Sequence, residues 1–447
     1  MDENDTTFTT LTELISQFPD DASLYYSLGI DYYRKKSWKN AASAFKTAIH
    51  KKADYVDAYY HLGLAYFYLN VFTESKICFD AVLQFNKTHM GARFYLGCVY
   101  LATAQIDAAF SLFYALHRDY PYHFETQVNL SHCYLAKADI THARLLLESA
   151  LKLSPTDTQV LFNLGVLAFH QNRLSEAMNY YQSVLEISYD DVAARYNLAL
   201  SYLNSGLSSE AQTHLQLLST IAPAFEPAQY LLQALLKDSA VKSAPVAFVS
   251  MLFDQYAIHY DAHMSLLHYS VPDKLYALFK QHVTFHQPLD CVIDLGAGTG
   301  KMGELLAAHT KRLIGVDVSS AMLEVARAKL IYTELHQDDL TRYLQFDIEK
   351  EAADCIVAAD SLVYVGDLST LMQAVASALK PGGYFLFNVE KAEGGQYQLQ
   401  PTGRFTHAAS YIHELLNHAF LIVHEEEVVL RYQDETPVIG YVYLGRI

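Results

Sequence analysis

The first half of the sequence repeats with a period of 34 residues, and this period constrains the fold more than any other feature. A leucine followed by a small residue occurs six times in one phase, at Leu28-Gly29, Leu62-Gly63, Leu96-Gly97, Leu130-Ser131, Leu164-Gly165 and Leu198-Ala199. Sixteen residues after each small residue stands a large apolar one, in order Phe45, Phe79, Phe113, Leu147, Tyr181 and Leu215. No insertion interrupts the six copies, and such periodicity is typical of stacked helical repeats.

The residue types within each copy predict a pair of helices that cross closely. The small residue lets the two helices approach, and the large apolar residues fill the layer between neighbouring pairs. A proline at the end of three copies stops the second helix, because proline cannot continue the hydrogen-bond ladder. Residues 226–237 are predicted to form a terminal helix, which a solenoid needs to cover its last apolar face.

This pattern resembles the tetratricopeptide repeat family over about residues 21–224. The resemblance implies an N-terminal α-solenoid whose concave surface, lined by the first helix of each pair, binds a protein or peptide partner. An array that only assembles the molecule is the alternative, and the sequence leaves the oligomeric state open.

The second half of the sequence changes to alternating strands and helices. Residues 289–295 predict a strand that runs into the turn Gly296-Ala297-Gly298-Thr299-Gly300, followed by a helix, a second strand and Asp317. This order is typical of an α/β domain that binds a dinucleotide or nucleoside, with Asp317 placed to accept both ribose hydroxyls. Asp294 precedes the glycines, where it would repel a pyrophosphate but attract an ammonium group. A ligand with an amino acid end is therefore favoured over a nicotinamide or flavin dinucleotide.

Here the sequence resembles class I S-adenosyl-L-methionine-dependent methyltransferases, first through Val292–Gly300. Four further segments match in order: Asp317-Val318 with Met322 for ribose and adenine, Asp339-Leu340 for the adenine amino group, Asp360–Tyr364 beside the transferred methyl group, and the turn at 379–387. The resemblance implies a Rossmann-like, seven-stranded, mostly parallel sheet with an antiparallel last strand, and S-adenosyl-L-methionine as the cofactor. The runs at 419–429 and 437–444 suit the closing antiparallel hairpin.

An upstream segment around Tyr256 resembles the helix that covers the cofactor in many of these enzymes. Tyr256 would face the methionine end of the cofactor, and the alternative is an ordinary amphipathic helix that packs its tyrosines. The residues predicted to bind the cofactor are Tyr256, Asp294, Gly296, Ala297, Gly298, Gly300, Asp317, Val318, Met322, Asp339, Leu340 and Asp360.

Methyl transfer is an in-line displacement, so it needs a general base only when the acceptor arrives protonated. Tyr364 and His407 are the candidates to orient or deprotonate an acceptor. The Asn-Pro-Pro-aromatic motif of enzymes that methylate DNA bases or glutamine amides is absent, which disfavours those acceptors. Metal-ligand spacing is also absent, and the reaction requires no metal.

The composition indicates the partners and the compartment. A formal net charge of −17 argues against DNA or RNA as the main partner, because nucleic-acid binding depends on Lys and Arg. An acidic N-terminus, no long apolar run and five scattered cysteines predict a cytoplasmic protein that does not enter the membrane.

We therefore expect a repeat domain over residues 1–240 and a catalytic domain over 245–447. Three functions fit this organisation. The first is methyl transfer to a protein or carrier-bound acceptor recruited by the repeats. The second is methylation of a small-molecule carboxylate or hydroxyl, with the repeats serving assembly. The third is a non-catalytic scaffold, which the near-complete cofactor motifs disfavour.

Overall fold

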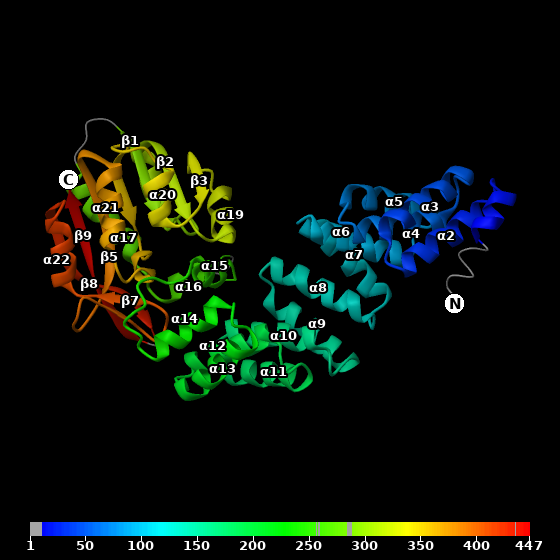
Figure 1. The fold of residues 1–447 in the computed structure, drawn as a ribbon, viewed down its shortest axis with the longest axis horizontal. Coiled ribbons are helices and arrows are strands. Elements are labelled where there is room, and N and C mark those ends of the chain that lie inside the picture. The colour runs from blue at the N-terminus through cyan, green and yellow to red at the C-terminus, as the bar shows by residue number, and fades with distance from the viewer. Residues whose placement is uncertain (1–10, 256, 258–259, 284–287, 434) are drawn as a thin grey trace. The chain divides into compact units, whose positions relative to one another are not determined.

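The computed structural model describes residues 11–447 except 256, 258–259, 284–287 and 434 (Figure 1). The chain divides into two compact units between Ala194 and Arg195, within helix α12 (Val192–Asn204). The domain boundary that the sequence places near residues 240–245 marks the change from helical repeats to alternating strands and helices. It is not the same as the boundary between the compact units, and it stays a prediction.

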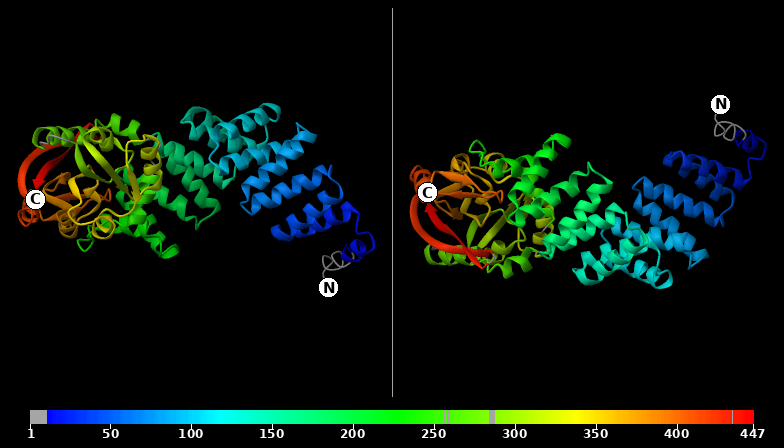
Figure 2. Two further views of the ribbon diagram at one scale, coloured as in Figure 1. Left: turned by 90° about the horizontal axis from the view of Figure 1, so that it is seen from above. Right: turned by 90° about the horizontal axis from the view of Figure 1, so that it is seen from below.

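The repeats form antiparallel helix pairs, as the sequence predicts (Figures 1 and 2). In the first unit the pairs are α2 (Ala22–Arg34) with α3 (Trp38–Lys51), α4 (Val56–Tyr68) with α5 (Phe72–Phe85), α6 (Met90–Ala102) with α7 (Ile106–Asp119), α8 (Phe124–Ala136) with α9 (Ile140–Leu153), and α10 (Thr158–His170) with α11 (Leu174–Ile187). The rest of α12, with α13 (Ser208–Ile221) and the predicted terminal helix α14 (Glu226–Leu235), belongs to the second unit.

The close crossing within each pair depends on the size of two side chains. A Cβ atom added at Gly97 would lie 2.7 Å from the buried ring of Phe113. In four pairs the small residue is glycine and its partner is aromatic. In the pair α8–α9 serine replaces the glycine at Ser131, and the partner shrinks to Leu147, which is also fully buried. The two positions therefore share a fixed volume.

The second unit continues through α15 (Val246–Asp254), α16 (Tyr260–Leu266) and α17 (Val271–His282) into one mixed sheet. Its strands are β1 (Leu289–Leu295), β2 (Thr310–Asp317), β3 (Glu334–Gln337), β4 (Ala353–Ala358), β5 (Leu379–Lys391), β6 (Tyr397–Leu399), β7 (Phe405–His407), β8 (Leu421–Gln433) and β9 (Thr436–Arg446). The connecting helices are α18 (Lys301–Leu306), α19 (Ser320–Ala328), α20 (Leu340–Phe346), α21 (Ser369–Ala378) and α22 (Ala409–Asn417), with short 3-10 turns η2 (Ala307–His309) and η3 (Leu362–Tyr364).

Seven of these strands follow the order β3-β2-β1-β4-β5-β9-β8. The first five are parallel, and β9 runs antiparallel to both β5 and β8. The predicted Rossmann-like sheet and its antiparallel closing hairpin are therefore confirmed. The sheet also contains the short strands β6 and β7, which the sequence analysis did not anticipate, and β7 pairs with β5 at Glu390 and Lys391, beyond the end of β4.

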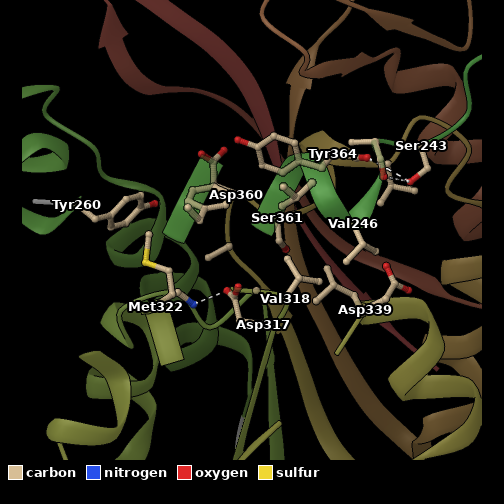
Figure 3. A pocket seen from close by; sticks show the side chains of 18 residues that line it. Ser243, Val246, Tyr260, Asp317, Val318, Met322, Asp339, Asp360, Ser361 and Tyr364 are labelled. Atoms are coloured by element: carbon tan, nitrogen blue, oxygen red, sulfur yellow. Dashed lines mark hydrogen bonds between the residues drawn. The ribbon is translucent and has the colours of Figure 1, made fainter. Parts of the chain in front are cut away.

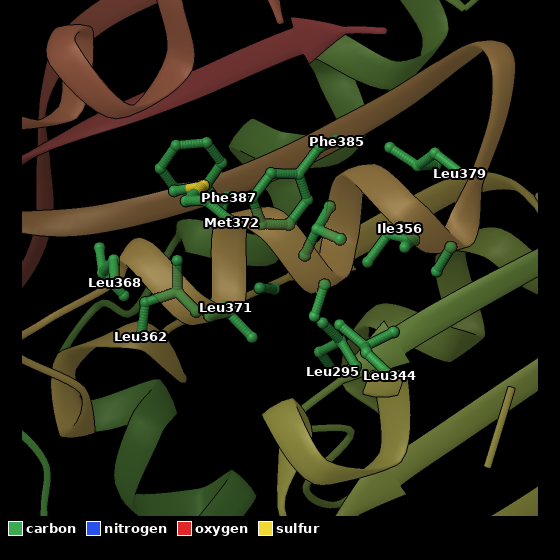
Figure 4. Close-up of a cluster of buried hydrophobic side chains, with 14 of the residues drawn as sticks. Leu295, Leu344, Ile356, Leu362, Leu368, Leu371, Met372, Leu379, Phe385 and Phe387 are labelled. Atoms are coloured by element: carbon green, nitrogen blue, oxygen red, sulfur yellow. The ribbon is translucent and has the colours of Figure 1, made fainter. Parts of the chain in front are cut away.

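The central strands of the sheet are buried on both faces, and successive residues of a strand pack on opposite sides. Ile293 of β1 belongs to a cluster with residues of α20, α21 and α22, of which Figure 4 labels Leu344 of α20 and Leu371 of α21. Its neighbour Val292 packs on the other face, in a cluster with residues of α17 and α18. The strand ends are thus fixed between two packed layers.

None of the helices in the described part of the chain combines the length and the apolar character that crossing a membrane requires.

We predict that Gly97→Ser destabilises the repeat array by about 1–3 kcal/mol, because the added side chain overpacks the ring of Phe113. The double variant Gly97→Ser/Phe113→Leu reproduces the Ser131–Leu147 pair and should recover part of that loss. Urea unfolding of both single variants and the double variant measures the coupling free energy. Gly394→Ser, at a site with no atom within 4 Å of the added Cβ, is the control. Strict additivity of the two single effects would contradict the shared-volume interpretation.

Candidate functional site

A cavity lies at the carboxyl ends of the parallel strands, where open α/β sheets place their ligand sites (Figure 3). It contains about 710 Å³ of space that no atom fills, part of which is open to solvent. Its walls come from the β1–α18 turn, the ends of β2, β3 and β4, and the preceding segment that includes α15 and α16. The lining residues are Ser243, Ala244, Val246, Val249, Phe253, Tyr260, Gly296, Gly298, Asp317, Val318, Met322, Asp339, Leu340, Ala359, Asp360, Ser361, Tyr364 and Val365.

The glycine turn after β1 brings bare backbone to the cavity wall. Gly296 has a φ of +76°, and a Cβ at this position would collide with the side chain of Ser361. Gly298 has a φ of +52°, and a Cβ there would meet only a backbone oxygen at 4.0 Å. A ligand can therefore approach the backbone at Gly298 closely.

Asp317, at the end of β2, is buried and held by backbone amides. Its Oδ2 accepts from the amide of Gly298 at 2.8 Å, and its Oδ1 accepts from the amide of Ser319 at 2.9 Å. Burial raises the pKa of Asp317 to about 6, although these hydrogen bonds act in the opposite direction. At neutral pH the carboxylate is therefore ionised and can accept hydrogen bonds from ligand hydroxyls.

The structure brings nine of the predicted site residues around this one cavity. They are Gly296, Gly298, Asp317, Val318, Met322, Asp339, Leu340, Asp360 and Tyr364. Ala297 and Gly300 belong to the same glycine turn without lining the cavity, and Tyr256 lies outside the described residues.

Asp294 is fully buried beneath the glycine turn and does not line the cavity. The hydroxyl of Tyr332 donates to its Oδ2 at 2.7 Å, whereas its Oδ1 has no hydrogen-bond partner among the described residues. Burial raises the pKa of Asp294 to about 7, against the effect of the Tyr332 hydrogen bond. A direct contact between Asp294 and a ligand ammonium group stays a prediction.

His407 is also fully buried away from the cavity lining. Its Nε2 lies 2.9 Å from the carbonyl oxygen of Val365 and 3.1 Å from that of Gly366, so Nε2–H donates to them. Burial lowers the pKa of His407 to about 4, so the ring is neutral at physiological pH. These hydrogen bonds fix the chain directly after η3. The proposed role of His407 as a base stays a prediction.

A buried cluster of four charged residues reaches the cavity through Asp360, the member to which the sequence analysis assigned a role. Nη2 of Arg404 donates to both carboxylate oxygens of Asp360 at 3.0 Å, and Nε of Arg404 donates to Oε1 of Glu390 at 2.7 Å. Arg431 donates to the same Glu390 oxygen at 2.8 Å. Burial alone would raise the pKa of Glu390, but Arg404 and Arg431 outweigh it and hold this pKa below its usual value. Two sequence signals pointed here: Glu390 ends the apolar run of β5, and the segment Gly403–His407 resembles one that lies near the substrate pocket of repeat-carrying methyltransferases.

Two helices upstream of the sheet cover the cavity and are fastened to it. Asp254 of α15 accepts from the hydroxyl of Ser319 at 2.6 Å and from the amide of Ala321 at 3.1 Å. Asp261 of α16 accepts from the hydroxyl of Thr299 in the glycine turn at 2.6 Å. Because Val246, Val249 and Phe253 of α15 and Tyr260 of α16 line the cavity, these contacts hold an apolar cover over it.

Comparison with known proteins matches both parts of the chain. The methyltransferase domain family matches residues 292–383, and a tetratricopeptide repeat family matches residues 26–75. The second ARM domain of tetratricopeptide repeat protein 21 matches residues 121–271.

Individual relatives that are named as methyltransferases each match about a quarter of the chain. A ubiquinone biosynthesis O-methyltransferase of Stutzerimonas stutzeri is 31% identical over 131 residues, covering 26% of this chain and 55% of that protein. A trans-aconitate 2-methyltransferase of Paracidovorax citrulli is 39% identical over 94 residues, and the match covers 21% of this chain and 35% of that protein. The chain thus spans about half or less of the length of these relatives.

Among solved structures, a Burkholderia thailandensis 1,6-didemethyltoxoflavin-N1-methyltransferase with bound 1,6-didemethyltoxoflavin and S-adenosylhomocysteine shares 18% identity with the chain. The match covers 46% of this chain and 92% of that one, with a TM-score of 0.37.

The raised pKa of Asp294 predicts a specific pH dependence of stability. A carboxyl group whose folded pKa is about 7 and whose ordinary value is 3.8 destabilises the folded state as pH rises between these values. The stability of the wild type relative to Asp294→Asn should therefore fall by roughly 4 kcal/mol from pH 4 to about pH 8 and stay constant above. Urea unfolding at several pH values measures this difference. Asp273→Asn, at an exposed carboxylate, is the control, and parallel curves for wild type and Asp294→Asn would refute the shift.

Proposed function

We propose that this chain, which carries tetratricopeptide repeats followed by a class I S-adenosyl-L-methionine-dependent methyltransferase domain, transfers a methyl group to a protein or carrier-bound acceptor that the repeats recruit. One observation carries the proposal. The glycine turn, Asp317, Asp339 and Tyr364, which four separate sequence motifs supply, converge on a single cavity at the carboxyl ends of the strands.

The residues of the cavity fit the cofactor chemically. Asp317 would accept the two ribose hydroxyls, Met322 and Leu340 would pack against adenine, and Asp339 would accept from the adenine amino group. The three charged residues among the described lining residues are all acids, which suits a ligand with a sulfonium and an ammonium group. When bound, S-adenosyl-L-methionine supplies an electrophilic methyl group.

The chain's own contribution to the reaction would be to orient the acceptor and exclude water. The cover formed by α15 and α16 places Val246, Val249 and Phe253 over the cavity, so water is displaced by apolar side chains. Asp360 and Tyr364 lie on the side of the cavity opposite Asp317 and Asp339, where an acceptor would enter (Figure 3).

The surface of the repeats supports a recruiting role. In the first unit a hollow between α3, α4 and α5 is lined by Ile49, Tyr59, Leu62, Tyr66 and Ile77, with Lys46 and Glu74 at its polar positions. Ile77 is 61% exposed, although isoleucine is usually buried. A partner chain with apolar side chains would cover this surface.

Methylation of a small molecule is the second candidate. The relatives named for ubiquinone biosynthesis and trans-aconitate favour it, because both names refer to small-molecule chemistry. In that case the repeats would serve assembly.

We predict that Asp317→Ala abolishes cofactor binding. Calorimetric titration of S-adenosyl-L-methionine into the full-length wild type should show micromolar binding, and the variant should lose at least a hundredfold in affinity, since two hydrogen bonds to a buried carboxylate are lost. Asp347→Ala, which removes an exposed carboxylate outside the cavity, should bind as the wild type does. A wild type that gives no heat with cofactor at about a millimolar would refute the enzymatic function.

The nature of the acceptor is tested by following the methyl group. The full-length protein is incubated with methyl-labelled cofactor and an extract of its own cells, and Asp317→Ala is the blank. We expect wild-type-dependent label in the acid-precipitated protein. Label confined to the acid-soluble fraction would reject the protein or carrier-bound acceptor and support the second candidate.

A further inference from the structure

Building on the proposed methyl transfer, we infer that the acceptor atom is a carboxylate oxygen, carried on an apolar chain or ring and received by the hydroxyl of Tyr364. The product would be a methyl ester. Four features of the acceptor side of the cavity carry this inference.

The first feature is the direction of the hydrogen bond at Tyr364. Nη1 of Arg404 donates to the phenolic oxygen at 3.2 Å, and the oxygen has no other hydrogen-bond partner among the described residues. Guanidinium groups only donate, so the phenolic hydrogen is not used in this contact. Because Tyr364 lines the cavity, its hydrogen is available to a ligand atom that accepts.

The second feature is what makes this donor strong. Arg404 is fixed on its other side by Asp360 and Glu390, so its guanidinium cannot turn away from Tyr364. A hydroxyl that accepts from a cation is polarised and donates more strongly, since consecutive hydrogen bonds reinforce one another. Such a donor is best matched by an ionised oxygen.

The third feature is that no carboxylate on the acceptor side is available as a base. Both oxygens of Asp360 are bound by Arg404, and Asp317 is held by two amides on the cofactor side. Asp339 follows β3, which is separated from β4 by β2 and β1, or about 14 Å at the spacing of neighbouring strands.

Tyr364 does not serve as a base either. Burial raises the pKa of Tyr364 above its ordinary value, against the effect of Arg404, so the phenol keeps its proton at neutral pH. The described lining residues also include no histidine or lysine. Because none of the described lining residues is placed to act as a general base, the site favours an acceptor that arrives with a free lone pair.

The common acceptor groups differ in this respect. An aliphatic amine is protonated at neutral pH, with a pKa near 10, and an alcohol must lose its proton to react. A carboxylate is ionised above pH of about 5 and needs no base. One of its oxygens forms the new bond to the methyl carbon as the carbon–sulfur bond breaks. The electron pair of that bond stays on sulfur, S-adenosylhomocysteine leaves, and no proton is released.

The fourth feature is the environment of the acceptor group. Val246, Val249 and Phe253 line the cavity and favour an apolar chain or ring attached to the carboxylate. Asp360 does not repel the anion strongly, because Arg404 compensates its charge and Arg431 lies 3.9 Å from it. The four-residue cluster of Asp360, Glu390, Arg404 and Arg431 is neutral overall.

The test uses three probes with the same carbon chain and different head groups: hexanoate, hexylamine and 1-hexanol. Each is titrated calorimetrically into full-length protein saturated with S-adenosylhomocysteine. We expect hexanoate to bind at least tenfold more tightly than the other two. Tyr364→Phe should weaken hexanoate about ten- to a hundredfold, the usual effect of losing a hydrogen bond to a charged group, and leave S-adenosylhomocysteine binding unchanged. Tyr276→Phe, whose hydroxyl lies 2.8 Å from Nε2 of His309 outside the cavity lining, should behave as the wild type.

With methyl-labelled cofactor, hexanoate should yield a product that alkali hydrolyses to labelled methanol, which methylated amines and ethers do not release. The inference is overturned if hexylamine or hexanol binds as well as hexanoate, if Tyr364→Phe has no effect, or if S-adenosylhomocysteine binds and none of the probes does. A protein that binds neither S-adenosylhomocysteine nor the cofactor would instead fail the proposed function itself.

Discussion

The pairing of β1 with β2 on one side and β4 on the other determines where each part of the cavity lies. Asp294 is opposite Gly315 of β2 and Val357 of β4, so all three strands end at the same level. The glycine turn, Asp317 and Asp360 follow directly from those ends. A register slip of one residue would turn the buried side chains of a strand to the other face, so the packing of both sheet faces protects this alignment.

The two sides of the cavity stabilise their carboxylates in different ways. Asp317 and Asp294 have raised pKa values because burial is only partly offset by hydrogen bonds from neutral groups. Asp360 and Glu390 are instead paired with guanidinium groups. A ligand in the cavity that brings hydroxyl donors or positive charge therefore stabilises Asp317 more than Asp360, whose charge Arg404 already compensates. The side of the cavity at Asp317 therefore suits a cationic nucleoside, whereas the side at Asp360 suits a second ligand that is not a cation.

The sequence predicted the parts of this structure that depend on local pattern. The 34-residue period identified the helix pairs. In every copy a small residue and a large one, such as Gly97 and Phe113, must fit together with compensating sizes. The segment from Val292 to Asp317 identified the strand, turn and second strand because it is continuous in the chain. The ion pairs of Asp360 with Arg404 and Arg431 were not predicted, because the two arginines come from distant segments. These segments are brought together only when β7 pairs with β5, β5 with β9, and β9 with β8. The extra strands β6 and β7 were too short to show a period.

Within the second unit, Tyr230 of the terminal repeat helix α14 contacts both the segment that precedes Arg404 and the covering helix α15. The hydroxyl of Tyr230 in α14 donates to the carbonyl oxygen of Gly403 at 2.8 Å, and Gly403 immediately precedes Arg404. The ring of Tyr230 also packs against Phe248 of the covering helix α15, with ring centroids 4.7 Å apart. Gly403 has a φ of +78°, and a Cβ there would lie 2.9 Å from the Phe248 ring, so glycine permits this close packing. The segment that presents Arg404 to Tyr364 and the helix that covers the cavity therefore rest on one shared support.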